Sequence, residues 1–236
     1  MNTQFFLGAY WHARRESIDE CTDRMHQMLS ELSTCDEILA TWYELGHSQK
    51  RALEKQINIS NRECLLKLLD GGRHKRDTDK TVIGELGFSA GLWNGGGKGK
   101  EVSLMVTCGS YSSNPHLGNC VTLNFPENLG KLKQSKRMVA VLASVATAWE
   151  PDWAGVMSRN AMNERNFNAR VPFVDWMIYV NNRLISQVPS LPSPIVVQQI
   201  EKIGSIIIIQ NEPPVSADPK HLQNIERIQV ALKTMR

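Results

Sequence analysis

Residues 82–108 alternate between apolar and polar side chains on both sides of a glycine-rich segment at 95–99. A period of two is the spacing of a β-strand with one buried face, and glycines between two such runs supply a turn. The pattern therefore predicts an antiparallel β-hairpin with a long, glycine-rich loop. Residues 120–125 predict a third antiparallel strand, so the sequence predicts an antiparallel meander in the middle of the chain.

Four other segments carry apolar residues at helical spacing, which predicts helices near 17–32, 61–70, 135–149 and 219–235. The first begins with Ser17 and Glu20 and the second with Ser60 and Glu63, both in the S-x-x-E capping pattern. Further short strands are predicted at 5–11, 38–45, 153–157, 173–180 and 205–209. The sum predicts an α+β fold, an antiparallel β-meander flanked by about four helices. We expect a single compact domain over residues 1–236, with 126–135 as the one candidate sub-boundary.

The composition is that of a folded protein with little net charge. The 236 residues include 27 Lys+Arg against 24 Asp+Glu, a net charge of +3, and 42% are hydrophobic. These values argue against intrinsic disorder and give no support to a strongly basic nucleic-acid binder. The five cysteines form no CxxC pair, so we expect reduced thiols rather than a disulfide framework or a zinc ribbon. No segment approaches the length of a membrane-spanning helix, and the apolar run at 5–11 does not read as a signal peptide. We therefore expect a cytoplasmic location.

Residues 87–91 match the G-x-S-x-G pattern of a nucleophile elbow, with Ser89 as the candidate nucleophile. A triad in hydrolase order would join Ser89, Asp152 or Asp175, and His221. The elbow requires a helix after the serine, but the glycine-rich segment that follows Ser89 cannot begin a stable one. A serine hydrolase is therefore the weaker alternative, and a serine on the hairpin is the favoured interpretation.

Other patterns for bound ligands are incomplete. The glycine-rich segment lacks the first glycine and the final Ser/Thr of a Walker motif, and histidines and cysteines occur only in isolated pairs. We therefore expect no metal and no cofactor. The basic run 73–76 with Lys98 and Lys100 leaves a nucleic-acid-binding module as a second alternative, although acids follow the run directly.

The segment 16–44 is acidic, with eight acids and one base, a net charge of −7. On the predicted first helix the carboxylates point away from the apolar stripe, so they form either a solvated face or a docking face for a basic partner. Six tryptophans are present, two of them around the turn at 149–153, and tryptophan frequently anchors interfaces. The candidate contact residues for a protein partner are Asp19, Glu20, Asp23, Glu31, Asp36, Glu37, Asp152 and Trp153.

Residues spread along nearly the whole chain resemble the immunity protein 52 family of bacterial polymorphic toxin systems. The features that carry the resemblance are Tyr10-Trp11 with Arg14, Arg15, Glu16 and Ser17; Trp42; 85–89 with 93–95; Trp149 with 151–154; Trp176 with Tyr179; and Gly204 with its isoleucine run.

The resemblance implies a non-catalytic cytoplasmic antidote that binds a cognate toxin. For this family the toxin is similar to a nuclease of restriction-endonuclease-like fold, often exported by a type VI secretion system. The family has no agreed catalytic residues, so it implies none here. The implied partner is the toxin domain, not nucleic acid or a membrane, and a homodimer and a toxin–antidote heterotetramer both stay open. The net charge of +3 argues against a whole-protein DNA mimic. Active-site plugging, local substrate mimicry and blocked toxin assembly are the alternatives that remain.

Overall fold

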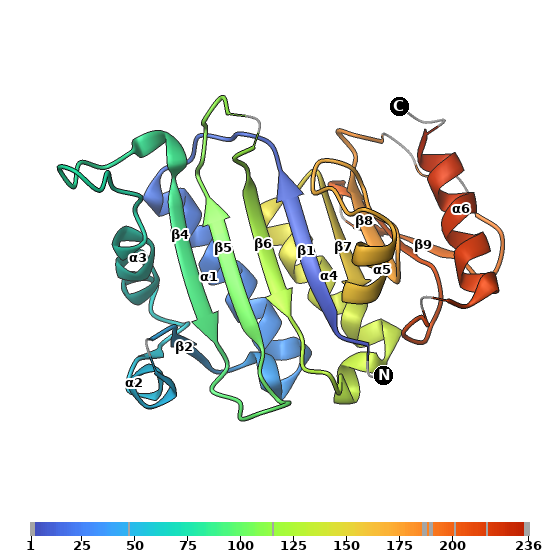
Figure 1. The fold of residues 1–236 in the computed structure, drawn as a ribbon, viewed down its shortest axis with the longest axis horizontal. Helices are drawn as coiled ribbons and strands as arrows, with labels where there is room; N and C mark the ends of the chain where they lie inside the picture. Colours follow the sequence, from blue (N-terminus) through green and yellow to red (C-terminus); the bar gives the residue numbers. More distant parts are fainter. Residues whose placement is uncertain are drawn as a thin grey trace.

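A ten-stranded antiparallel sheet forms the centre of the fold (Figure 1). The structure is a computed structural model that describes residues 3–46, 48–114, 116–185, 188, 191–200, 202–215 and 217–233. Within these residues the strand order is β3-β2-β4-β5-β6-β1-β7-β8-β10-β9, so the first strand lies near the middle of the sheet. The strands are β1 (Phe5–Trp11), β2 (Trp42–Glu44), β3 (Gln56–Ile57), β4 (Phe88–Trp93), β5 (Ser103–Cys108), β6 (Asn119–Asn124), β7 (Trp153–Ser158), β8 (Met177–Asn181), β9 (Val196–Ile200) and β10 (Gly204–Ile208).

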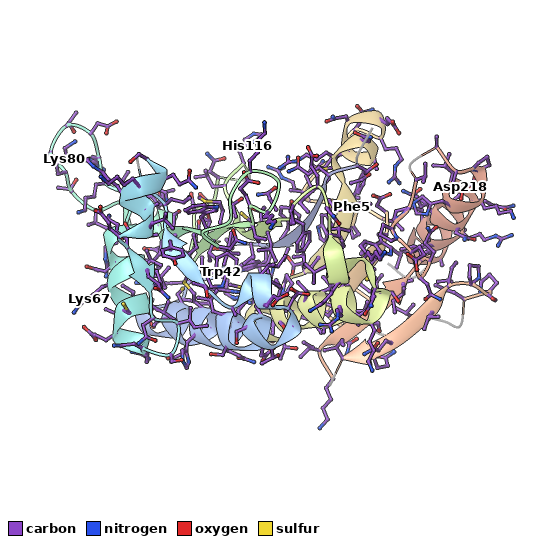
Figure 2. The ribbon with its side chains drawn as sticks, turned by 90° about the horizontal axis from the view of Figure 1, so that it is seen from below. Phe5, Trp42, Lys67, Lys80, His116 and Asp218 are labelled. Carbon is purple, nitrogen blue, oxygen red and sulfur yellow. The ribbon has the colours of Figure 1, made fainter. Side chains whose placement is uncertain are left out.

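Helices cover the two faces of the sheet unequally. In Figure 1 two long helices, α1 and α4, lie behind the sheet, and Figure 2 shows them as one layer on that side. The helix α5 lies on the opposite side, near β7 and β8, and α6 lies beside the β9 end. The helices are α1 (Ile18–Cys35), α2 (Gln49–Leu53), α3 (Arg62–Gly71), α4 (Ser135–Trp149), α5 (Arg159–Glu164) and α6 (Pro219–Lys233).

Two hydrophobic cores follow from this arrangement. The larger one lies between the sheet and the α1–α4 layer, and Trp42 and Trp149 are fully buried in it. The second lies on the other side of the sheet, where β7, β8 and β10 meet α5 and α6, with Trp153 and Ile228 among its members. Over β4, β5 and β6 only every second residue is fully buried, because only one face of these strands is covered.

The predicted α+β fold and its central meander are confirmed. Strands β4, β5 and β6 pair antiparallel in sequence order, and the helix predicted at 135–149 spans those residues. The capping box of α1 is present as predicted. The structure adds the short helices α2 and α5 and the edge strands β3 and β9, which no pattern predicted.

Three local predictions are wrong. The strand predicted at 38–45 is reduced to β2, because residues 37–39 form a 3-10 turn that the Asp36 side chain caps. The cap of α3 is Asn61 rather than Ser60, since Asn61 Oδ1 accepts from the backbone N–H groups of Glu63 and Cys64. The first strand of the hairpin begins at Phe88 rather than near 82, because residues 84–86 form another 3-10 turn.

Candidate functional site

The carboxylates of α1 lie on its outward face. Ser17 caps the helix by accepting from Glu20 N at 3.2 Å, and Ser17 N donates to Glu20 Oε2 at 2.7 Å. Residues such as Cys21 and Met25 are fully buried on the inner stripe. Helical geometry therefore directs Asp19, Glu20 and their neighbours toward solvent, as the sequence predicted.

Arg62 of α3 pairs with two of these carboxylates. Its Nε lies 2.6 Å from Asp23 Oδ1, and its Nη2 lies 2.9 Å from Asp19 Oδ1. The hydrogen bonds that Arg62 donates to the carboxylates of Asp23 and Asp19 raise the pKa of Arg62 further above its usual range. Sequence reasoning missed this partner, which is 39 residues from Asp23 along the chain. Because Arg62 neutralises part of the negative charge of Asp19 and Asp23, the outward face of α1 is less acidic than the net charge of residues 16–44 suggests.

The remaining acidic candidates do not join one cluster. Glu31 accepts a hydrogen bond from Gln27 on the same helix, and Glu37 lies 3.5 Å from the ammonium of Lys131. Asp36 is buried, and its Oδ1 accepts from Ile38 N at 3.2 Å. In this structure, Asp36 therefore caps the 3-10 turn at Glu37–Leu39.

Asp152 and Trp153 lie in a different place, beside a cavity of about 610 Å³ where the ends of β1, β6 and β7 meet. Asp152 Oδ2 accepts from His12 N at 2.9 Å and lies 2.9 Å from His12 Nδ1. Trp153 is only 2% exposed, packs on the Tyr10 ring at 4.8 Å and donates from Nε1 to Ala169 O. Its side chain supports the cavity wall and is not a surface anchor in this structure.

Three of the residues that carry the family resemblance, Trp11, Arg14 and Trp149, meet at the C-terminal end of α4. Trp11 stacks on Trp149 with ring centroids 5.5 Å apart, and Arg14 Nη2 donates to Trp149 O at 2.9 Å. Arg24 donates to Ala148 O at 2.7 Å and also to Glu16 Oε1, in the β1–α1 connection, at 2.7 Å. Both arginines thus satisfy carbonyl groups at the helix C-terminus, where positive charge is favoured.

The hydrolase arrangement is absent from the described residues. Ser89 lies within strand β4, and the strand β5 follows, so the elbow and its helix do not form. Its hydroxyl lies 3.0 Å from His74 Nε2. Two candidates do meet, because His221 Nε2 lies 3.2 Å from Asp175 Oδ1, but Ser89 is beside His74 and Asp152 pairs with His12. The three members of the sequence-derived triad are therefore not brought together.

The geometry of the described residues does not support the metal-site or nucleic-acid hypotheses. Among the described residues, no group of three or more His, Cys, Asp or Glu side chains could hold a metal ion. Arg73, in the basic run, is bonded to Asp70 at 2.6 Å and lies over the Phe88 ring. None of the helices in the described part of the chain combines the length and apolar character needed to cross a bilayer.

Comparison with known proteins assigns the family. The model of the family described as Immunity protein 52 (Imm52) matches residues 3–235. The chain belongs to the immunity protein 52 family. This immunity protein is similar in structure to the Pseudomonas aeruginosa T6SS protein PA0821, with a TM-score of 0.61 and 13% sequence identity. The match covers 99% of this chain and 76% of the other, and at this identity it shows the fold alone. The search of curated proteins gives no significant match.

Proposed function

We propose that this immunity protein neutralises a cognate secreted nuclease toxin in the cytoplasm by binding its toxin domain. The family match over 3–235 is the observation that carries the proposal. The structural neighbour is described as a T6SS protein, which supports export of the toxin by that system. The serine hydrolase alternative loses its structural basis, because Ser89 lies within strand β4 and contacts His74 rather than His221.

Inhibition in this proposal is steric and local. A chain with a net charge of +3 cannot imitate DNA over its whole surface, because DNA presents a dense array of negative charge. A bound immunity protein would instead cover the toxin's active site or prevent the toxin from assembling. Light scattering of the purified complex gives its molar mass, which distinguishes a heterodimer from a heterotetramer.

The carboxylates of the α1 side are one candidate contact surface. Asp19, Glu20, Asp23, Glu31 and Glu37 would attract a basic toxin surface and raise the association rate. Charge reversal at Asp19, Asp23 and Glu31 tests this contact, because it should slow association and reduce its dependence on salt. Unchanged association kinetics would remove the α1 side from the interface.

Co-expression with the toxin encoded beside this chain tests the function. Cells that produce both proteins should survive, whereas cells with the toxin alone should die. A matched control expresses the toxin with an unrelated protein from the same promoter. If cells with both proteins die as fast as those with the control, the proposed function is wrong.

A further inference from the structure

The side of the sheet that faces away from α1 and α4 is uncovered over β2, β4, β5 and β6 (Figure 1). Side chains of this side are half-buried or exposed, whereas their neighbours along each strand pack into the larger core. We call this surface the open sheet face. Its members are Tyr43, Leu45, Ser89, Gly91, Trp93, Ser103, Met105, Thr107, Cys120, Thr122 and Asn124.

The strand register arranges these residues in rows. Gly91 pairs with Met105, and Met105 pairs with Thr122, so this row crosses three strands at the centre of the face. Paired residues of antiparallel strands project to the same side of a sheet. The rows on either side are Ser89–Thr107–Cys120 and Trp93–Ser103–Asn124.

None of the eleven residues is charged. Charged residues make up 22% of the chain, so about two would be expected among eleven positions. Charged and basic groups lie at its borders: Arg159 donates to Asn124 Oδ1 at 2.6 Å, His74 lies 3.0 Å from the Ser89 hydroxyl, and Lys98 and Glu101 line a shallow pocket together with Leu45 and Trp93. An uncharged surface loses little solvation when another protein covers it, so it complements an uncharged partner surface.

Large apolar side chains gather at the β2–β4–β5 part of the face. Leu45 is 47% exposed and Met105 is 41% exposed, and both reach over Gly91. A Cβ atom at Gly91 would lie 2.6 Å from Leu45 Cδ1 and 2.9 Å from Met105 Sδ, so glycine leaves room for these two side chains. On the same part of the face, the Tyr43 and Trp93 rings contact each other with their centroids 6.2 Å apart. Tryptophan, tyrosine and methionine are the residue types enriched in interface cores.

At its β6 edge, the open sheet face continues into the cavity beside Asp152. Cys120 belongs to the open sheet face and also lines the cavity, together with Tyr10 of the next strand. The cavity of about 610 Å³ is large enough to receive a protruding side chain. The face and the cavity therefore form one continuous surface on the side of the molecule opposite α1.

The size of the face distinguishes between occupants. Strands β4, β5 and β6 have six residues each and β2 has three, so at about 4.8 Å between strands and 3.4 Å rise per residue the face spans roughly 340 Å². A standard interface buries about 800 Å² on each partner, so a two-fold dimer built on this face alone would be about half that size. A separate domain that also enters the cavity covers a larger area.

We propose that the open sheet face and the adjoining cavity bind the toxin domain, through an uncharged ridge of the toxin that lies across the Gly91–Met105–Thr122 row. This inference rests on the proposed function and assigns its contact surface. The apolar cluster at Leu45 and Met105 supplies the central anchor, and the cavity receives a toxin side chain at the other end.

The test places single charges on the face in the full-length protein. Met105→Glu introduces a carboxylate at a position that is 41% exposed, and Thr122→Glu introduces one at a half-buried position of the same row. Val230→Glu, at a residue of α6 that is 58% exposed, is the matched control. Binding to a catalytically inactive variant of the adjacently encoded toxin is measured by surface plasmon resonance. We expect Met105→Glu and Thr122→Glu to weaken binding at least about 100-fold, because each charge would be buried without a partner. The control should bind like the wild type.

Circular dichroism and thermal unfolding establish that each variant is folded, and two variants on different strands keep the test usable if one misfolds. If the wild type does not bind the toxin, the proposed function fails. If the wild type binds and both folded face variants bind equally well, the inference about the surface is overturned. It is also overturned if the face variants only convert a wild-type dimer to a monomer while toxin binding is unchanged.

Discussion

Asp175 carries a carboxylate that is fully buried and held by three donors. Ser158 N donates to Oδ2 at 2.7 Å, Arg165 Nη2 donates to Oδ1 at 3.0 Å, and His221 Nε2 lies 3.2 Å from Oδ1. Arg165 follows α5 and His221 belongs to α6, so one carboxylate links both helices to the start of β8. Replacing Asp175 with alanine would therefore loosen the whole second core.

The expected loss is large because the donors would stay buried without their acceptor. His221 is 1% exposed, and burial lowers the pKa of Arg165, although the nearby Asp175 charge opposes that shift. Removing one partner of a buried ionic network costs about 3–5 kcal/mol. For a chain of this size each kcal/mol lowers Tm by about 2–4 °C, so Asp175→Ala should lower Tm by roughly 6–20 °C.

Urea and thermal unfolding followed by circular dichroism measure this loss. The exposed Asp77→Ala variant is the matched control and should change stability by less than about 0.5 kcal/mol. A double-mutant cycle with His221→Ala should give a coupling energy of about 1 kcal/mol or more. A loss of less than about 1 kcal/mol for Asp175→Ala would refute the reasoning, since it would mean that the donors find other partners.

Three further substitutions probe the fold locally. Gly87→Ala should destabilise the protein by about 2 kcal/mol or more in urea unfolding, because Gly87 has a φ of +66° and an added Cβ would lie 2.6 Å from Ser110 N. Ser17→Ala should lower the unfolding free energy by about 1 kcal/mol through loss of the α1 cap, and an unchanged midpoint would contradict the assigned cap. Hydrogen bonds from Ser17 lower the pKa of Glu20, so the stabilisation is present above the ordinary carboxyl pKa and is lost as pH falls through the folded value. Glu20→Gln should therefore be less stable than the wild type at neutral pH and equal to it in strong acid, as measured by unfolding at both pH values.

Several elements could be predicted because their signals are local. The two-residue alternation on either side of 95–99 predicted the β4–β5 hairpin, and Ser17 with Glu20 predicted the start of α1. Spacing within a few residues defines such elements, since the side-chain period of a strand or helix is a property of the backbone alone. The uncharged alternate positions of β4, β5 and β6 were also visible in the sequence, but a period of two does not say which face a helix will cover.

The contacts that give the protein its surfaces depended on the tertiary structure. Arg62 meets Asp19 and Asp23 because α3 packs beside α1, and no sequence spacing encodes that approach. His221 pairs with Asp175 rather than with Ser89 because the order of strands in the sheet separates them. Strand order also decides that α1 and α4 cover one face of β4, β5 and β6 and leave the other open. The sequence by itself thus determined the local elements and, through its match over 3–235, the family. Which side chains meet was decided only by packing, because non-local contacts form where buried surfaces fit together.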